Sequence, residues 1–493
     1  MKRYILAIDL GTTLIKFVLF DFKLGLVAEH SRDYELQTSQ EFIEFDADGY
    51  WEQIKEGIGE LVSKSGIDPA YIASIGLSSQ AETLVLLDKD NNPVRKAISW
   101  LDNRSREECE RIRANFNPKD SYRITGQPDI ITTWPITKIL WIKDKEREVF
   151  KRTRKFLLLK DYIIYKLTGR FVSEYSIYNF SYYFNIITKE YWDSMLDFVG
   201  VDREQLPELI EPGKEVGPIT ASVAEEFGFD KNLLINAGAL DQMAGMIGVG
   251  NIREGVVSET TGTVLTISTL IEEPVFSEAR IPCHYSAIRG KYVLLPVCES
   301  GGISLEWFKR NFYKDKGYAY IDKQAENVSP GCNDLLFLPY LTGVNAPEYN
   351  ADARGVFYGI NIQHNESHFA RAVMEGVAFL LKKNLDFMES SLNIRIEEVF
   401  SLGGGANSQL WNQIKSDVLD KQIKITSNRQ PTALGAAMLS AVDMGLYRDL
   451  ASIAAEVIRL KKTYSPKDHD KYLKPYRTFI NLYQKLEPFF SRR

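Results

Sequence analysis

Asp241 stands at a junction that suits a general base. It follows an apolar, strand-like run at 233–239 and opens a segment, 241–246, that is rich in small residues and typical of a helix. A carboxylate placed where a buried sheet gives way to a helix is well positioned to accept a proton from a reacting group. Asp241 is therefore the candidate catalytic residue.

Two other segments pair an acid with a Gly/Thr turn between apolar, β-rich runs. One runs from Asp9 to Thr13, with Lys16 adding a cation nearby, and the other runs from Glu259 to Thr263. Glycine lets the backbone approach an anion, so that amide N–H groups and threonine hydroxyls point at phosphate oxygens. A single turn of this kind is more often an ordinary hairpin. Two such turns together with Asp241 indicate phosphoryl transfer, with one supersecondary unit used once in each half.

The length of the chain predicts two domains with a cleft between them. A chain of 493 residues exceeds what one hydrophobic core usually serves, since domains typically hold ~100–200 residues. The second phosphate unit begins shortly after Gly248 to Asn251, where glycines would permit a hinge. We therefore expect domains at 1–247 and 248–493, with a hinge that lets the cleft close.

Composition narrows the class of partner. The net charge is −6, with acids and bases interspersed, which argues against a nucleic-acid surface or a polybasic membrane contact. Four cysteines without CxxC spacing are typical of a reduced, cytoplasmic protein. No apolar stretch approaches the ~20 residues of a membrane helix. We expect a small-molecule substrate and no membrane or nucleic-acid partner.

The order of the predicted elements indicates an α/β fold. Strand-like runs at 73–78 and 83–87 alternate with helical periodicity in the first half of the chain, and 369–388 carries apolar residues at helical spacing. These elements would place the two turns and Asp241 at the ends of buried strands.

Taken with these features, two sequence signatures resemble the FGGY carbohydrate kinases, members of the actin and hexokinase superfamily. Residues 355–360, His368-Phe369 and 372–375 fit the C-terminal signature of that family throughout. The N-terminal signature is matched only at its centre, by Pro135, Lys138 and Trp141. The resemblance covers essentially the whole chain and implies two ribonuclease-H-like domains that flank a catalytic cleft.

The resemblance also implies roles for the phosphate and nucleotide residues. Asp241 corresponds to the catalytic base of the family, and Asp9 to the acid that holds Mg²⁺ directly or through water. ATP would be bound by the two turns and the loop near Gly301, and its adenosine by the segment from Ser401 to Asn407, which contains the adenosine loop at 403–407 with its glycine run. The implied nucleotide-binding residues are Gly11, Thr12, Thr13, Lys16, Thr261, Gly262, Thr263, Gly301, Gly404, Gly405 and Asn407.

The acceptor side departs from the best-known family patterns. Xylulokinases characteristically have Met-His where this chain has Ala81-Glu82, and glycerol kinases have Arg-Glu. A glutamate that binds hydroxyls suits any polyol and so cannot name one. The implied acceptor-binding residues are Gln80, Ala81, Glu82, Trp100, Asp102, Asp241 and Gln242.

The expected activity is transfer of the γ-phosphoryl group of Mg·ATP to a primary hydroxyl of a small sugar or polyol, as in xylulokinase-like enzymes. A glycerol or other polyol kinase is the nearest alternative. An actin-like or chaperone-like ATPase without an acceptor, and a protein that binds nucleotide without turnover, are the alternatives from other classes. The sequence does not determine the acceptor, the hydroxyl that is phosphorylated or any allosteric control. It also leaves the oligomeric state open, with a homodimer as one option.

Overall fold

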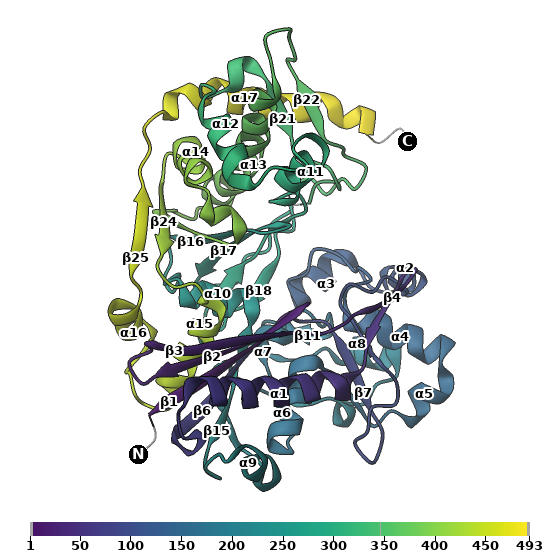
Figure 1. Ribbon diagram of the computed structural model, residues 1–493. Helices are drawn as coiled ribbons and strands as arrows, with labels where there is room; N and C mark the ends of the chain where they lie inside the picture. The colour runs from purple at the N-terminus through teal and green to yellow at the C-terminus, as the bar shows by residue number, and fades with distance from the viewer. Residues whose placement is uncertain (1–2, 346, 491–493) are drawn as a thin grey trace.

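Two α/β domains face each other across a cleft in the computed structural model, which describes residues 3–345 and 347–490 (Figure 1). The first domain is built on a six-stranded sheet in the order β14-β15-β6-β1-β2-β3. These strands are β1 (Tyr4–Leu10), β2 (Leu14–Asp21), β3 (Leu26–Asp33), β6 (Ile72–Ser79), β14 (Glu215–Pro218) and β15 (Leu234–Leu240). The arrangement confirms the predicted α/β fold.

The second domain repeats the central arrangement of the first. Its largest sheet has the order β18-β19-β17-β16-β23-β24-β25, with β20 paired to β17. Its strands are β16 (Val256–Thr261), β17 (Leu265–Ile271), β18 (Cys283–Tyr285), β19 (Tyr292–Leu294), β20 (Val297–Cys298), β23 (Glu398–Leu402), β24 (Gln422–Thr426) and β25 (Leu460–Tyr464). In both sheets an antiparallel hairpin, β1–β2 or β16–β17, lies beside a parallel strand, β6 or β23.

Helices cover the faces of the sheets that turn away from the cleft. In the first domain, α1 (Ala47–Ser65) and α6 (Leu159–Thr168) share an apolar core with β1, β2 and β6. In the second, α13 (Glu366–Ser391) contains the predicted helix at 369–388 and lies with α14 (Gln409–Leu419), α11 (Ile303–Phe312), α12 (Tyr318–Glu326) and α17 (His469–Phe490) on the outer side of the sheet (Figure 1). Asn365 caps α13, its side chain accepting a hydrogen bond from Ser367 N.

Smaller elements complete the two domains. A five-stranded sheet, β4-β5-β8-β7-β9, extends the first domain beyond the end of β6. Its strands are β4 (Gln37–Ser39), β5 (Phe42–Phe45), β7 (Leu84–Leu87), β8 (Ala97–Ile98) and β9 (Lys155–Leu158). Two-stranded pairs are β10 (Val172–Glu174) with β13 (Glu208–Ile210), β11 (Phe184–Asn185) with β12 (Glu190–Tyr191), and β21 (Leu336–Leu338) with β22 (Val356–Tyr358). The remaining α-helices are α2 (Arg106–Asn115), α3 (Pro118–Thr125), α4 (Pro135–Lys145), α5 (Arg147–Arg152), α7 (Tyr175–Tyr178), α8 (Asp193–Val199), α9 (Ala221–Phe227) and α16 (Leu450–Val457). Across the described residues, no helix is both long enough and apolar enough to cross a bilayer.

Two helices join the domains at the floor of the cleft. Helix α10 (Asp241–Gly248) follows β15, and α15 (Pro431–Asp443) comes from the C-terminal part of the chain yet packs against β1 and β6. Figure 1 shows both helices between the two large sheets. The predicted sequence boundary at 247/248 lies between the strands of the two large sheets. Helix α15 follows this boundary in sequence but packs against the sheet of the first domain.

Glycines allow α10 and α15 to approach at backbone distance. A Cβ added at Gly435 would lie 1.8 Å from the carbonyl oxygen of Ala244, and one at Gly248 would lie 1.8 Å from that of Pro431. Neither position has room for a side chain, because real Cβ contacts do not approach this closely. Gly248, expected from the sequence to loosen a hinge, instead serves this close packing.

We expect Gly435→Ala to lower the free energy of unfolding by roughly 1–3 kcal/mol or more, because the added methyl forces α15 away from α10. Gly59→Ala is the matched control: Gly59 lies in α1, an added Cβ meets nothing within 4 Å, and Ala favours a helix over Gly by roughly 1 kcal/mol. Thermal and urea unfolding measure both changes. Equal stability of the two variants would contradict the close helix crossing.

Candidate active site

A cavity of about 1000 Å³ lies between the domains, next to the first phosphate turn and Asp241. It brings together eight of the residues predicted from the sequence: Asp9, Gly11, Thr12, Thr13, Lys16, Asp241, Gln242 and Asn407. The hydroxyl residues Ser258 and Thr260 of β16 also line it. The other predicted residues lie outside this lining: Gln80, Ala81, Glu82, Trp100, Asp102, Gly262, Thr263 and Gly301 in loops, Thr261 at the end of β16, and Gly404 and Gly405 in the 3-10 helix η4 (Gly404–Asn407).

Asp241 is the first residue of α10, directly after β15. The backbone leading to it is fixed because Leu240 N donates a hydrogen bond to Ser176 Oγ at 3.0 Å. Its own carboxylate accepts a hydrogen bond from Gln242 N at 2.6 Å. Burial and the nearby charge of Asp9 raise the pKa of Asp241 to about 7, although Gln242 N–H, Lys16 and Lys160 oppose the rise. A carboxyl with this pKa accepts a proton readily near neutral pH.

Asp9 lies at the end of β1, opposite Asp241 in the cavity lining. Ser78 of the neighbouring parallel strand donates a hydrogen bond from Oγ to Asp9 Oδ1 at 3.0 Å, and Lys16 Nζ lies 3.7 Å from Asp9 Oδ2. Burial raises the pKa of Asp9, while Lys16 and Ser78 lower it. These two neighbours favour the charged form, which is the form that binds a cation.

The donor set around Asp9 fits Mg²⁺ held mostly by substrate and water. Within the described residues, no three His, Cys, Asp or Glu side chains gather into a protein-only metal site. Mg²⁺ is usually bound through one or two carboxylates together with phosphate oxygens and water. Asp9, 6% exposed and lining the cavity, supplies one such carboxylate.

The second phosphate turn is packed against two glycine loops. Gly302 N donates a hydrogen bond to Gly262 O at 2.6 Å, and a Cβ at Gly301 would lie 2.4 Å from the backbone of Val264. A Cβ at Gly405 would lie 2.6 Å from Thr261 Cβ. The turn, the loop at 301–302 and the short 3-10 helix η4 (Gly404–Asn407) thus form one close-packed unit.

Gly404 differs from its neighbours, because an added Cβ there meets nothing within 4 Å. Its space is open, whereas Gly403 has a left-handed φ of 74° and Gly405 is packed against Thr261. Position 404, three residues before the cavity-lining Asn407, therefore has room for a side chain.

The acceptor-side loop begins where β6 ends. Gln80 donates from Nε2 to Gly11 O at 3.3 Å, which ties this loop to the first phosphate turn. Glu82 is 9% exposed, has a left-handed φ of 63°, and makes no hydrogen bond or ion pair with the described residues. Burial raises the pKa of the Glu82 carboxyl, and Asp241 raises it further against the effect of Lys138. A strained, buried carboxyl without a partner is suited to ligand binding.

Lys138 of α4 lies fully buried near Glu82. Its Nζ donates to Thr133 O at 2.9 Å. Burial lowers the pKa of Lys138, and Glu82 and Asp102 counteract that effect. Lys138 therefore supplies a positive charge behind the acceptor loop that offsets two buried acids.

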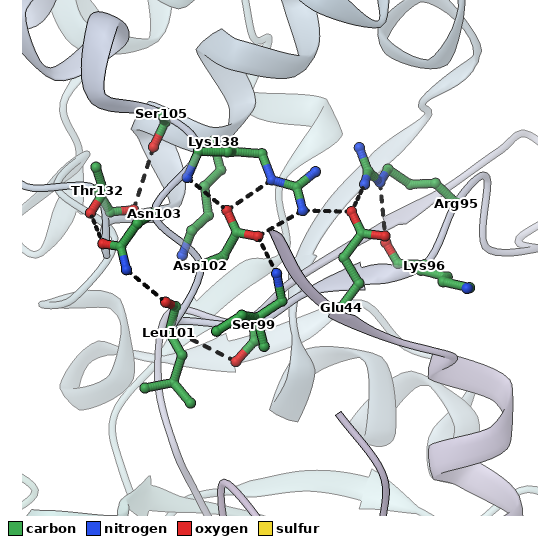
Figure 2. A network of polar contacts seen from close by, with 12 residues as sticks. Glu44, Arg95, Lys96, Ser99, Leu101, Asp102, Asn103, Ser105, Thr132 and Lys138 are labelled. Carbon is green, nitrogen blue, oxygen red and sulfur yellow. Dashed lines mark hydrogen bonds and ion pairs between the residues drawn. The ribbon is translucent and has the colours of Figure 1, made fainter. Parts of the chain in front are cut away.

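Trp100 and Asp102 play different parts in the structure. Trp100 Nε1 donates to Thr12 Oγ1 at 3.0 Å, so the indole joins the acceptor loop to the first phosphate turn. Asp102 is fully buried, and its carboxylate accepts hydrogen bonds from Arg104 Nε at 2.8 Å and from Ile43 N at 2.7 Å. Arg104 continues to Glu44, and Figure 2 shows Asp102 at the centre of this network. The geometry favours a positioning role for Asp102 over the direct acceptor contact that the resemblance implies.

Three contributors escaped the sequence analysis. Ser78 bonds Asp9, Ser176 holds the residue before Asp241, and the hydroxyl of Tyr34 donates to Thr12 O. Ser78 stands in register with Asp9 on a parallel strand, so a correct strand pairing would have found it. Tyr34 and Ser176 carry no local signal, because both reach the site through tertiary packing.

The comparisons with known proteins match this geometry. The N-terminal domain of the FGGY family of carbohydrate kinases matches residues 4–248, and its C-terminal domain matches residues 256–444. The chain belongs to this family. This kinase is 31% identical to the xylulose kinase of Bacillus subtilis over 98% of its own length and 96% of the relative's.

Solved structures show the same two-domain fold. A ligand-bound xylulose kinase from Lactobacillus acidophilus superimposes with a TM-score of 0.92 at 29% identity, covering 99% of each chain. A gluconate kinase from the same organism has a TM-score of 0.90 at 30% identity, covering 98% of each chain. The predicted actin and hexokinase superfamily fold is confirmed, and family membership decides for a carbohydrate kinase over an actin-like or chaperone-like ATPase.

We expect Asp241→Asn to lower kcat by ~10² or more, because the amide cannot take the acceptor proton. The KM values for both substrates should change little. In the unsubstituted enzyme kcat should rise with pH through about 7, since the base works only when deprotonated. Steady-state kinetics from pH 5.5 to 9 measure both effects. Full turnover by folded Asp241→Asn would place the base elsewhere.

Gly404→Arg should raise the KM for the nucleotide far more than the KM for the acceptor, because position 404 has room for the side chain and belongs to the glycine run predicted to bind ATP. Thr263→Val, which removes a predicted phosphate hydrogen bond, should act in the same direction. Circular dichroism should show a native fold for Gly404→Arg. A change confined to the acceptor KM would invert the assignment of the two halves of the cleft.

Proposed function

We propose that this kinase transfers the γ-phosphoryl group of ATP to a primary hydroxyl of a small, electrically neutral ketose or polyol. The observation that carries the proposal is that Asp241, half-buried at the start of α10, lies near enough to the buried Glu82 to raise the pKa of the Glu82 carboxyl. Lys138 offsets Glu82, while Lys16 and Lys160 offset Asp241. An acceptor with its own carboxylate would bring a further acid beside these two in a low-dielectric region, which is unfavourable.

A neutral acceptor satisfies the same groups. A glutamic acid side chain with a raised pKa donates one hydrogen bond and accepts others, which suits vicinal hydroxyls. Because the Glu82 side chain makes no hydrogen bond in the free protein, an acceptor hydroxyl can bond to it without breaking an existing hydrogen bond. The similarity to xylulose kinases along nearly the whole chain agrees with a neutral ketose.

The chain's own residues account for the steps of the transfer. Asp241 takes the proton of the acceptor hydroxyl as that oxygen attacks the γ-phosphorus and the bond from that phosphorus to the bridging oxygen breaks, releasing ADP. Lys16, Thr12 and Thr13 line the cavity beside the first turn and would contact phosphate oxygens. Mg²⁺ near Asp9 would neutralise charge on the phosphates when bound. Gln80 and Trp100, which bond the first turn, would keep acceptor and phosphate in register.

The cellular setting follows the same proposal. All four cysteines, Cys109, Cys283, Cys298 and Cys332, are free and buried, which supports a reducing, cytoplasmic environment. A homodimer stays a prediction, to be measured by light scattering.

A coupled ADP-release assay tests the proposal directly. Ketopentoses, aldopentoses, pentitols, tetritols, glycerol and gluconate are compared at equal concentration. We expect a neutral ketose or polyol to give the highest kcat/KM, and gluconate to fall ~10²-fold or more below it, since unmatched polar groups discriminate strongly. Gluconate as the best acceptor would overturn the neutral-acceptor proposal while leaving the kinase activity intact.

Glu82→Gln and Glu82→Ala should lower kcat/KM for the best neutral acceptor, because hydrogen bonds to the acceptor hydroxyls are lost. The loss of transition-state stabilisation should be roughly 2–4 kcal/mol. The KM for ATP should hardly change. Glu108→Gln is the matched control: Glu108 is also buried, with Oε2 unpaired, but it lies on α2 and not in the acceptor-side loop that follows β6. Wild-type kinetics for Glu82→Ala would remove Glu82 from the acceptor site.

A further inference from the structure

A buried ion pair lies directly behind the second phosphate turn. Glu259 of β16 and Lys415 of α14 are 0% and 1% exposed, and Lys415 Nζ lies 2.6 Å from Glu259 Oε1. Strand residues alternate in direction, so Ser258 and Thr260 line the cavity while Glu259 and Thr261 point to the opposite face, toward α14. The pair is therefore close to the nucleotide loops without facing the cavity.

Both members of the pair hold the side chain of Thr261. Thr261 Oγ1 donates to Glu259 Oε2 at 2.7 Å and accepts a hydrogen bond from Lys415 Nζ at 2.9 Å. Ser401 of β23 also donates to Glu259, which fixes the carboxylate from a third side. With its hydroxyl bonded on two sides, Thr261 has a single rotamer available.

The rotamer of Thr261 sets the distance between two nucleotide elements. Gly405 of η4 packs so closely that its added Cβ would lie 2.6 Å from Thr261 Cβ and 2.8 Å from Cγ2. Gly403 would meet Thr261 O at 2.9 Å. The same helix α14 holds η4 by a second contact, from Asn412 Nδ2 to Ala406 O at 2.8 Å. Thr261, the first residue of the phosphate turn at 261–263, is thus the spacer that sets the distance from this turn to the predicted adenosine loop at 403–407.

We propose that Lys415 and Glu259 are positioning residues for the nucleotide: they lock Thr261 and so fix the spacing between the phosphate turn and the adenosine loop. This inference rests on the proposed use of ATP. A buried ion pair contributes little net stability compared with an apolar pair of similar size. The pair acts on position instead, because a rigid spacer holds the phosphate and adenosine ends of one ligand at a fixed distance from each other.

The test separates positioning from folding. Lys415→Met alone leaves Glu259 unpaired in the interior and would destabilise the protein, so the informative variant is the double substitution Lys415→Met with Glu259→Gln. We expect it to fold and to raise the KM for ATP about tenfold, with the acceptor KM within about twofold of wild type. Equilibrium titration with ADP should show the same loss of affinity.

A double-mutant cycle identifies Thr261 as the intermediary. Thr261→Val should raise the KM for ATP about tenfold, and Thr261→Ser, which keeps the hydroxyl, should restore most of the affinity. Adding Lys415→Met and Glu259→Gln to Thr261→Val should produce little further change, because all three act through one contact. Multiplicative effects would overturn the inference.

A second buried pair serves as the control. Arg371 and Glu375 are 6% and 3% exposed in α13, and neither lines the cavity. Arg371→Met with Glu375→Gln should change thermal stability but leave the KM for ATP unaltered. If the Lys415 and Glu259 double variant behaves in the same way, the pair is structural only and the inference fails. If the wild-type enzyme releases no ADP with any acceptor, the proposed function fails instead.

Discussion

The backbone contact between α10 and α15 is the constraint on which the active site depends. Helix α10 begins with Asp241 and lies so close to α15 that Gly435 meets the carbonyl of Ala244 without space for a Cβ. Because α15 also packs against β1 and β6, the strand that carries Asp9 and the helix that carries Asp241 form one rigid body. The two acids keep their separation whatever the second domain does.

If the cleft closes, the movement would therefore bring the second domain toward the acid pair. The segment after α10 is firmly held: Asn251 is fully buried and donates from Nδ2 to Ser258 Oγ at 3.0 Å and to Ser268 O at 2.9 Å. A loose glycine hinge between 248 and 251, as the sequence suggests, does not agree with this packing. Any relative motion would instead come from small sliding of packed helices, in which interfaces move together.

Local chemistry in the sequence was sufficient to predict the helix at 369–388 and the places of the two turns and of Asp241 at the ends of strands. Glycine, threonine and acidic residues at strand ends carry their signal within a few positions. The contacts that orient these groups were not accessible in the same way, because Ser176, Tyr34 and Lys415 reach them across 64, 22 and 154 positions. For Asp102 the sequence motif was recognised, but its contacts were not predicted. Only the structure reveals that the Asp102 carboxylate accepts hydrogen bonds from Arg104 Nε and Ile43 N.

The two phosphate units also differ in a way that the sequence alone conceals. Their hairpins close at Leu10 with Ile15 and at Thr261 with Leu265, so Asp9 corresponds to Thr260, and Glu259 corresponds to Ile8. Both Asp9 and Thr260 line the cavity. A one-residue offset reverses the face of a strand, so the acids of the two units point in opposite directions.

The offset assigns different work to the two acids. Ile8 is a buried core residue beneath α1 and α6, whereas the corresponding Glu259 brings a charge to the helix-covered face, where Lys415 neutralises it. A buried carboxylate without that cation would be strongly unfavourable. The first unit thus places its acid in the cavity lining, and the second places a neutral threonine there. A second cavity-facing carboxylate at position 260 would repel a triphosphate bound in the cavity. Threonine at this position avoids that repulsion.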